Sequence, residues 1–435
     1  MAKKKKKGVW VSWNENIQHP YDTLFIVQSE EELQSAITGA KRIRFYGNKQ
    51  SSADITGGVQ TLVDLKSYNS ILSYDDNQRL ITVQSGIKLV DLIEAIEAKG
   101  WCIPCLPDIN TVTIGGALAT GTHGTSGKLL ANYVQQFRVI LADGTIKEIK
   151  EDNPLIDAFR VSIGVLGVVS TLTFRCELNY TLHVQERPEK DTVWLQNLKE
   201  KVARYDFYRI LWMPHTGKGY VIQGTKIPSD KFIPEQHGPS YLKYRRAVSK
   251  LLYKYTHLSP WFTVFANRII AFAFFNSKTE HKGSLYQATV TKSRGATLEL
   301  AEWTIGFDNF PKVFKALKKE IDKWDNKAFV HIPMDIRFVQ KDQSWLSYAY
   351  DQDTVTVGCV SRNAKTAESY EAFKTIEEIF IKYGGRPHWG KRFKAKDKEL
   401  EKLYPKWNEF KALRKQLDPD NKFLNGYLKK VFNEK

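Results

Sequence analysis

Short apolar runs alternate with amphipathic stretches over the first 178 residues of this 435-residue chain. Apolar runs bounded by Gly, Asn or Asp are typical of strands, whereas apolar residues that recur every three or four positions predict helices. Strands are predicted over Leu24–Val27, Ile43–Tyr46, Thr61–Asp64, Leu80–Gln84 and Val168–Phe174, and a hairpin over Gln136–Ala142 and Thr145–Ile149. The hairpin turns at Asp143-Gly144, a strong turn signal. Helices are predicted over Glu31–Thr38 with Ser29 as its N-cap, Lys88–Lys99 and Pro154–Arg160.

The pattern changes after Cys176. Residues 179–227 are strand-like, and residues 287–361 mix strands with a helix. The expected strands are Leu298–Ile305, Ile332–Val339 and Thr354–Val360, and the expected helices are Phe310–Trp324 and Ala364–Gly384.

The segment 241–275 is basic and aromatic, with apolar residues at helical spacing that Pro260 interrupts. One interpretation is a pair of ordinary helices with one face in a core. The other is an element that lies on a membrane surface with basic flanks. Both remain open at the level of sequence.

Composition limits the possible partners. The length favours two domains, and 42% hydrophobic with 26% charged residues is typical of a globular chain. A formal charge of +17 predicts attraction to anionic surfaces, either nucleic acid or acidic lipid. Zinc-finger spacing, RNP motifs and basic heptads are lacking, so no specific nucleic-acid binding is expected. The charge leaves peripheral contact with an anionic membrane as a hypothesis.

The lysines Lys3 to Lys7 precede no apolar region, so this end does not have the pattern of a signal peptide. A solvated tail or a lipid-headgroup contact is expected there instead. Apolar runs long enough to span a membrane are lacking. The expected location is cytoplasmic or peripheral on the cytoplasmic face of a membrane. The oligomeric state is left open.

The chain has four cysteines, Cys102, Cys105, Cys176 and Cys359, which argues against a disulfide scaffold and fits a reducing compartment. Cys102 and Cys105 have the spacing of a thioredoxin motif, which should open a helix. Here the pair leads through Leu106-Pro107-Asp108 into a glycine-rich stretch. Two small residues in a loop are therefore expected, rather than a redox pair.

That stretch, Thr113 to Gly127, contains five glycines among its fifteen residues. Glycine lets a backbone approach a ligand closely, and converging N–H groups can bind an anion. The stretch is a candidate pyrophosphate cradle, with a glycine-rich turn between strands as the alternative. It follows neither the dinucleotide fingerprint nor the P-loop pattern. It closely resembles the flavin-binding loop of the FAD-linked oxidases of the vanillyl-alcohol oxidase type, most of all the aldonolactone and alditol oxidases.

Further stretches along nearly the whole chain resemble this family. Trp10 to Asn14 is similar to its N-terminal segment, Arg44 to Ser51 to its first flavin loop, and Gly164 to Val169 to the segment over the adenine. His388-Trp389-Gly390-Lys391 is similar to the segment near the flavin ring. Asp418-Pro419 and Phe423-Leu424-Asn425 match the C-terminal ending.

The resemblance implies an α+β fold. It consists of a two-subdomain FAD-binding domain of the PCMH type over residues 1–178 and an α+β substrate (cap) domain over residues 179–380. A C-terminal segment, residues 381–435, returns to the flavin site.

The implied cofactor is FAD, and no metal is expected. In many family members a His of the first loop bonds covalently to the flavin 8α-methyl, but this chain has Gln50 at the matching position. An amide cannot form that bond, so FAD is expected to be bound non-covalently. The residues expected to hold it are Tyr46, Gly47, Asn48, Lys49, Gln50, Ser51, Ser52, Pro107, Thr113, Gly115, Gly116, Thr120, Gly121, Thr122, His123, Gly124, Gly167, Val169 and His388.

The implied activity is that of an FAD-dependent oxidoreductase which oxidises a CH–OH group of a sugar-derived, aldonolactone-type substrate. Hydride passes to flavin N5 and the hydroxyl proton departs. Lys391 and Arg337 are the candidate cations, and Asp335 either orients Arg337 or accepts the proton through a water. Cys359 and Trp389 are expected to contact the substrate. His123 is expected to be a structural hydrogen-bonding residue.

Two departures from the family concern the substrate. The family's Glu-x-Arg becomes Asp335-Ile336-Arg337, whose period-two spacing keeps both side chains on one face of a strand. Alditol oxidases carry a His and a Thr where this chain has Gly358 and Val360. Unpartnered polyol hydroxyls would each cost roughly 1–3 kcal/mol, so a small linear alditol is disfavoured.

Two alternatives remain. The decaprenylphosphoryl-ribose oxidases also hold FAD non-covalently and have a Cys on the strand before a late Lys, which Cys359 and Lys391 resemble. A lipid-linked sugar would suit the basic, aromatic segment 241–275. The second alternative is a non-enzymatic membrane-surface binding protein on the same fold. The electron acceptor, whether oxygen, a quinone or a cytochrome, is left open.

Overall fold

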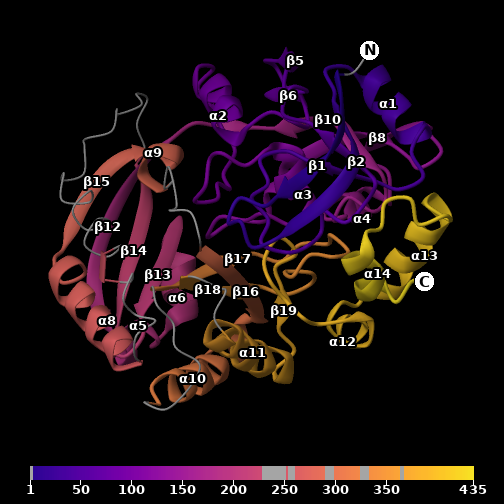
Figure 1. Ribbon diagram of the computed structural model, residues 1–435. Helices are drawn as coiled ribbons and strands as arrows, with labels where there is room; N and C mark the ends of the chain where they lie inside the picture. The colour runs from indigo at the N-terminus through magenta and orange to yellow at the C-terminus, as the bar shows by residue number, and fades with distance from the viewer. Residues whose placement is uncertain (1–2, 228–250, 253–259, 290–297, 324–332, 363–366) are drawn as a thin grey trace.

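The structure, a computed structural model, describes residues 3–227, 251–252, 260–289, 298–323, 333–362 and 367–435. Two sheets form its N-terminal part, and an eight-stranded antiparallel sheet forms its middle part (Figure 1). The last residues fold back between the two parts, so that the chain ends close to the first sheet. This architecture confirms the α+β fold expected from the sequence.

The first sheet has the order β1-β2-β4-β3. Its strands are β1 (Lys3–Val11), β2 (Gln18–Ile26), β3 (Ile43–Tyr46) and β4 (Thr61–Asp64), with α1 (Glu30–Thr38) packed on them. The predicted cap is confirmed, because the Ser29 hydroxyl accepts from the N–H of Glu32 at 3.3 Å. Leu33, Ala36 and Ile37 of α1 are buried against Val27 and Val63.

The second sheet has the order β5-β6-β10-β8-β9. Its strands are β5 (Ile71–Asp75), β6 (Leu80–Gln84), β8 (Val134–Ile140), β9 (Ile146–Lys150) and β10 (Val168–Arg175). The predicted β8–β9 hairpin is confirmed, and its turn uses Gly144 at φ +89°. Helices α2 (Leu89–Glu97), α3 (Ile114–Ala119), η1 (Leu130–Tyr133) and α4 (Ile156–Arg160) accompany this sheet, together with the short pair β7 (Trp101–Cys102) and β11 (Glu177–Leu178).

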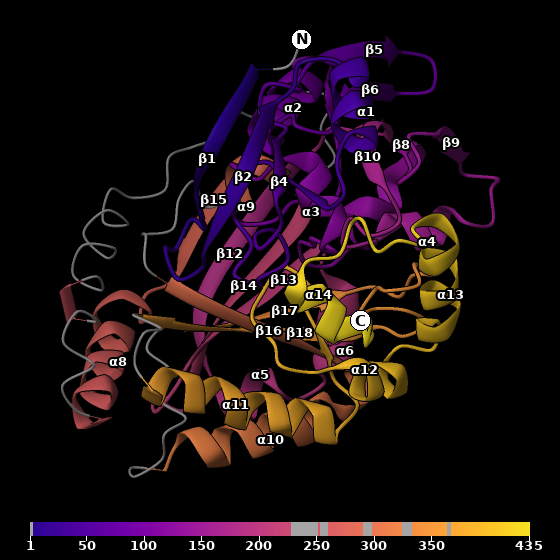
Figure 2. The ribbon, with the colours of Figure 1, turned by 45° about the vertical axis from the view of Figure 1, so that its right-hand side comes forward.

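The eight-stranded sheet has the order β15-β12-β14-β13-β17-β18-β16-β19. Its strands are β12 (Thr181–Lys190), β13 (Phe207–Met213), β14 (Lys218–Ile227), β15 (Thr279–Ser284), β16 (Leu298–Gly306), β17 (Met334–Val339), β18 (Thr354–Arg362) and β19 (Arg386–Pro387). Its helices are α5 (Asp191–Trp194), α6 (Leu198–Arg204), α8 (Pro260–Phe274), α9 (Leu285–Thr289), η3 (Phe307–Asn309), α10 (Phe310–Ile321) and α11 (Ala367–Lys382). Helices α10 and α11 lie side by side and cover one face of the sheet (Figure 2), which leaves the other face of β16–β18 to meet the N-terminal part.

The C-terminal residues close on the first sheet. They form α12 (Asp397–Leu403), α13 (Trp407–Leu417) and α14 (Gly426–Phe432). Asn425 donates from Nδ2 to the carbonyls of Asp54 and Gly57, both at 2.8 Å. The buried Arg44 donates to the carbonyl of Phe423 at 2.8 Å. These contacts bring the end of the chain beside its first flavin-type loop.

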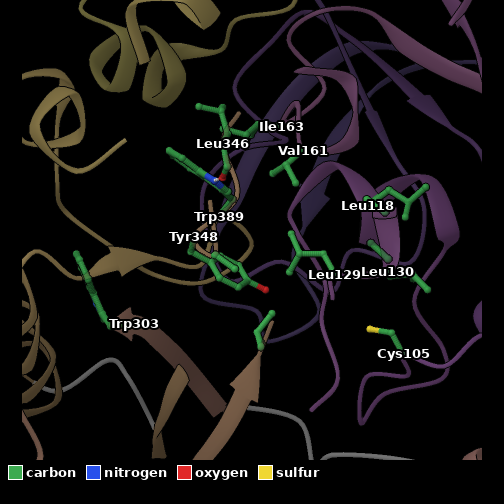
Figure 3. Packing of buried hydrophobic residues seen from close by; sticks show 14 of the residues in the cluster. Cys105, Leu118, Leu129, Leu130, Val161, Ile163, Trp303, Leu346, Tyr348 and Trp389 are labelled. Atoms are coloured by element: carbon green, nitrogen blue, oxygen red, sulfur yellow. Dashed lines mark hydrogen bonds between the residues drawn. The ribbon is translucent and has the colours of Figure 1, made fainter. Parts of the chain in front are cut away.

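One hydrophobic core continues from the N-terminal part into the eight-stranded sheet. Figure 3 shows Trp389 and Tyr348 facing Leu129 and Val161, although the two pairs are more than 180 residues apart in sequence. All four side chains are buried. The two parts therefore pack as one folded unit, and a site between them is built from both.

Two expectations need correction or completion. Lys3 to Lys7 form no solvated tail: they lie in β1, whose exposed lysines occupy an edge of the first sheet. Lysines on an edge strand oppose pairing with other chains.

In the segment 241–275, residues 241–250 and 253–259 lie outside the described part. Helix α8 buries Val264, Ala266 and Ile270 as in an ordinary core helix.

Within the described part of the chain, the helices are all too short or too polar to cross a bilayer.

Candidate functional site

A cavity of about 320 Å³ lies between the loops of the N-terminal part and the face of β16 and β17 that meets this part. Most residues expected to hold a cofactor line it. They are Tyr46, Gly47, Asn48, Lys49, Gln50, Ser51, Pro107, Thr113, Gly115, Gly116, Thr120, Thr122, His123, Gly167, Val169 and His388. Two of the expected catalytic residues, Lys391 and Arg337, line it as well. The structure thus brings three segments to one cavity: the first flavin-type loop (Arg44–Ser51), the glycine-rich stretch Thr113–Gly127, which is the second flavin-type loop, and the late His–Lys segment.

Three expected cofactor residues, Ser52, Gly121 and Gly124, do not line this cavity. The N–H of Ser52 donates to the carbonyl of Gly390 at 2.8 Å. Gly121 has φ +70°, and a Cβ at Gly124 would lie 2.7 Å from the Leu106 carbonyl oxygen. These backbone features shape the loops behind the cavity wall, and the contact of the three residues with a cofactor stays a prediction.

The two flavin-type loops touch each other at Gly47, where a Cβ would lie 1.9 Å from Thr113 Oγ1. Gly115 of the second loop packs against the residue that follows β6, where a Cβ would lie 2.9 Å from the Ser85 Cβ. Only glycine permits such an approach. Asn48 Nδ2 also donates to the Thr111 carbonyl at 2.8 Å. The loops therefore form one continuous wall of backbone.

Buried polar atoms of three residues that line the cavity fit an elongated polar cofactor. Trp10 Nε1, Trp13 Nε1 and Ser85 Oγ are buried and have no hydrogen-bond partner among the residues that the structure describes. All three residues line the cavity. Buried donors without acceptors are rare in native proteins, so a ligand with several acceptor oxygens suits them. FAD, with its ribityl chain and pyrophosphate, meets this requirement.

A buried carboxylate that the sequence did not single out, Glu302 of β16, lies at the cavity end near Lys391. Its Oε2 accepts from Lys391 Nζ, and its Oε1 is hydrogen-bonded to His123 Nε2. Burial alone would raise the pKa of Glu302, but Lys391 and His123 hold this pKa well below its ordinary value. A Glu inside an apolar strand is itself a signal, because buried charges are paired.

His388 is a neutral ring. The N–H of Gly390 donates to its Nδ1 at 3.0 Å, so Nδ1 carries no proton. Burial, and then the neighbouring Lys391, depress the pKa of His388 well below its ordinary value. The proton of the neutral ring therefore lies on Nε2, which makes His388 a hydrogen-bond donor there rather than a base.

Four charged side chains form a second buried cluster. Asp335 and Arg337 lie on one face of β17 as predicted, with Arg337 Nε donating to Asp335 Oδ2 at 2.8 Å. Arg209 of β13 lies 2.7 Å from Asp335 and 2.8 Å from Asp108, and Arg337 lies 2.6 Å from Asp108. Asp108 lies in the segment that leads into the second flavin-type loop, so it joins this segment to the sheet. Neither Asp108 nor Arg209 was predicted from the sequence as a partner of Asp335 and Arg337.

The pKa shifts in this cluster keep Arg337 and Asp335 in their charged forms. Burial opposes the charge of Arg337, yet Asp108 and Asp335 raise its pKa above the ordinary value. Burial likewise opposes the charge of Asp335, yet Arg209 and Arg337 lower its pKa. Asp335 does not line the cavity, and its oxygens already accept from the two arginines. This geometry favours Asp335 as an orienting group for Arg337 over a proton acceptor.

The two residues expected to contact substrate lie elsewhere, and this expectation is corrected. Gly358 of β18 pairs with Asp335 and Glu302 on the cavity face, so the next residue, Cys359, points to the opposite face. Cys359 is 1% exposed among core residues, and burial raises its pKa. Trp389 is fully buried, donates from Nε1 to the Leu346 carbonyl at 2.7 Å, and lies outside the cavity lining (Figure 3).

Cys102 and Cys105 are free and buried, and burial raises the pKa of each to about 12. A protonated thiol is a poor nucleophile. Their environment therefore agrees with small structural residues rather than a redox pair.

Among the described residues, His123, Glu302 and His388 have potential metal-ligand atoms within 4.8 Å of one another. The ammonium of Lys391, however, lies on the same carboxylate. Its positive charge opposes a second cation there, so the group is interpreted as a hydrogen-bonded charge cluster.

Comparison with known proteins adds family relationships to this geometry. The family model described as D-arabinono-1,4-lactone oxidase matches residues 172–431, and the model described as FAD binding domain matches residues 21–150. L-gulonolactone oxidase of Mus musculus is 28% identical over 95% of this chain and 94% of its own length. L-gulono-1,4-lactone dehydrogenase of Mycobacterium tuberculosis is 29% identical over 97% of this chain and 99% of its own length.

The fold also has a solved relative. The crystal structure of cholesterol oxidase from Brevibacterium sterolicum superposes with a TM-score of 0.80 at 15% identity, covering 99% of this chain and 97% of that one. At this identity the likeness concerns the fold alone.

The Asp108 cluster yields a prediction about stability. Asp108→Asn leaves two buried arginines with one carboxylate, so we expect the free energy of unfolding to fall by about 3 kcal/mol. Urea denaturation of the purified protein measures this change. Asp91→Asn, at an exposed position of α2, is the control and should change it by less than about 0.5 kcal/mol. Equal stability of the two variants would show that Asp108 does not join its segment to the sheet.

Proposed function

Because the chain belongs to the D-arabinono-1,4-lactone oxidase family, we propose that its substrate is an aldonolactone, whose CH–OH group it oxidises. The chain is an FAD-dependent oxidoreductase. The observation that carries the proposal is one cavity that both flavin-type loops line together with Lys391 and Arg337. Names of the mouse and mycobacterial relatives, a lactone oxidase and a lactone dehydrogenase, support the same substrate class.

Each residue at this end of the cavity has a role in the proposal. FAD supplies the acceptor for the hydride that leaves the substrate carbon. Lys391 places an ammonium in the cavity, where negative charge develops on the reduced ring or on the substrate oxygen. Arg337, oriented by Asp335 and Asp108, offers hydrogen bonds to a substrate oxygen. His388 contributes a neutral donor at Nε2.

The charge balance of the second cluster bears on the substrate. Two arginines and two aspartates cancel one another, so Arg337 offers hydrogen bonds without net attraction for an anion. A neutral lactone suits this cluster better than an open-chain acid, whose carboxylate would approach Asp108. Gly358 also offers no polar side chain for a polyol hydroxyl. These features favour a lactone over an alditol.

The two alternative functions have less support. Oxidation of a lipid-linked sugar depended partly on Cys359 near the substrate, and Cys359 points away from the cavity. A non-enzymatic role on the same fold leaves the paired charges around Lys391 without a purpose. Aldonolactone oxidation needs no contact between Cys359 and the substrate, and it gives the charges around Lys391 a role.

We propose further that the FAD is held non-covalently, because Gln50 occupies the cavity wall where the linking His is expected. The purified protein should be yellow, and acid precipitation should release its flavin into the supernatant. The variant Gln50→His should retain part of the flavin in the pellet if position 50 faces the flavin methyl group. Flavin that stays in the pellet of the native protein would mean that another residue forms a covalent bond.

The catalytic proposal predicts the behaviour of Lys391→Met. Under anaerobic conditions an aldonolactone such as L-gulono-1,4-lactone should bleach the flavin of the native protein. Lys391→Met should keep bound FAD but bleach about 10²-fold more slowly or worse, the usual cost of removing one stabilising donor. Lys398→Met, at an exposed position of α12, should behave as the native protein. Full bleaching by Lys391→Met would remove Lys391 from the reaction.

For the location of the protein, we propose peripheral contact with an anionic membrane on its cytoplasmic face. Helix α8 exposes Trp261, Phe265 and Phe272, by 57%, 40% and 77% respectively, and the chain carries a charge of +17. Aromatic side chains suit the membrane interface, and lysines suit anionic lipid.

Co-sedimentation with vesicles of phosphatidylserine and phosphatidylcholine tests this contact. The native protein should bind, and replacement of all three aromatic residues by Ser should weaken binding about tenfold or more, given the apolar area they bury. Leu178→Ser, at another exposed apolar position, is the control. Equal binding of native and triple-variant protein would contradict the contact through α8.

A further inference from the structure

Both oxygens of the Glu302 carboxylate are occupied, one by each of two elements outside its own strand. Oε1 is bonded to His123 of the second flavin-type loop, and Oε2 to Lys391 of the C-terminal segment. The side chains of His123 and Glu302 are 3% and 5% exposed, whereas that of Lys391 is 20% exposed and borders the cavity. Lys391 is thus the member of the group that faces a ligand.

Counting hydrogens gives the charge of this group. His123 Nδ1 lies 2.8 Å from the carbonyl oxygen of Gly124, which only accepts, so Nδ1 carries a hydrogen. A hydrogen bond between His123 Nε2 and Glu302 Oε1 then requires one more proton, on either atom. Wherever that proton sits, the His123–Glu302 pair is neutral as a whole. The three groups His123, Glu302 and Lys391 together therefore carry a net charge of +1.

We propose that Glu302 and His123 form a neutral dyad that positions the Lys391 ammonium toward the N1–C2 edge of FAD. The dyad makes Glu302 and His123 positioning residues, acting through Lys391. This proposal rests on the proposed function, because it takes the cavity as the flavin site.

The surroundings of the dyad support this role. A Cβ on Gly358 would lie 3.2 Å from Glu302 Oε2, so the glycine leaves room for the carboxylate beside Lys391. The ring of His388 lies 5.7 Å and that of Tyr348 5.5 Å from the His123 ring. His388 is neutral, and burial, followed by the charge of Glu302, raises the pKa of Tyr348 well above its ordinary value. Arg337 is already paired with Asp108 and Asp335, and Cys359 is protonated.

The main chain holds the Lys391 segment independently of the dyad. The N–H of His388 donates to the Glu302 carbonyl at 3.0 Å, and the N–H of Arg392 donates to the Leu300 carbonyl at 2.9 Å. Loss of the Glu302 side chain therefore leaves the backbone of Lys391 in place. Only the flexible lysine side chain loses its anchor.

Sulfite titration of the oxidised holoenzyme tests the dyad without any turnover. Sulfite donates its electron pair to flavin N5, and the negative charge of the adduct spreads to N1 and C2. A nearby cation strengthens this adduct, and bleaching of the flavin spectrum measures its dissociation constant. Glu302→Leu removes the anchor of Lys391, and Glu302→Gln keeps one oxygen acceptor for it.

The sign of the change separates positioning from simple electrostatics. If Glu302 acts only as a nearby negative charge, its removal makes the site more positive and tightens the adduct. If it positions Lys391, Glu302→Leu weakens the adduct about tenfold or more, and Glu302→Gln weakens it less. An unchanged or tighter adduct in Glu302→Leu would overturn the proposal.

Two further variants complete the experiment. Glu299→Leu is the matched control, because Glu299 is buried on the same strand but contacts Asn16 and Arg392 rather than Lys391, and it should leave sulfite affinity unchanged. Adding Lys391→Met to Glu302→Leu should cause little further loss, since both changes remove the same charge. Independent, additive losses would overturn the proposal.

The outcomes also separate this proposal from the proposed function. A native protein without flavin would contradict the function itself. Flavin binding with normal lactone bleaching, together with sulfite affinity that does not respond to Glu302, would contradict only the dyad. If Glu302→Leu does not fold, the sign of the change in Glu302→Gln decides, because tightening contradicts positioning and weakening supports it.

Discussion

The buried carboxylate of Glu302 is the constraint on which the functional end of the cavity depends. A charge removed from water must be paired and hydrogen-bonded, or it neutralises. Glu302 finds its partners on two other elements, His123 in the second flavin-type loop and Lys391 in the C-terminal segment. The requirement to pair one charge therefore ties three distant parts of the chain together at one point.

In a second cluster, buried charges are likewise paired with one another. Asp108 comes from the N-terminal part, whereas Arg209, Asp335 and Arg337 come from the eight-stranded sheet. The cluster is neutral overall, so it orients Arg337 without attracting a substrate anion. The contact of Gly47 with Thr113 keeps the two flavin-type loops close enough to form one backbone wall. Together these contacts hold a polar, donor-rich cavity between two packed parts.

Local signals in the sequence predicted much of this arrangement. The Asp143-Gly144 turn, the Ser29 cap and the glycine-rich stretch each depend on neighbours within a few residues, and the structure agrees with them. The placement of Asp335 and Arg337 on one face of β17 was also predictable, because side chains alternate between the two faces of a strand whatever its neighbours are. His388 and Lys391 were found through the resemblance of their segment to a family, and both line the cavity.

What the sequence did not reveal depends on pairing between distant segments. Glu302 meets His123 across 179 residues, and Arg209 meets Asp108 across 101, which no local pattern encodes. The direction of Cys359 follows from the register that sets Gly358 opposite Asp335, and register is a property of two strands. Lys3 to Lys7 had the composition of a tail, but pairing with β2 makes them an edge strand.

The central claim is that this cavity holds FAD with its reactive ring at the Lys391 end. A crystal structure of the holoenzyme tests it most directly. We predict that the pyrophosphate lies against the Gly47 and Gly115 loops and that Lys391 Nζ lies within hydrogen-bonding distance of the flavin N1–C2 edge. A flavin ring at the Arg44 and Gly164 end, with adenine near Lys391, would contradict the claim.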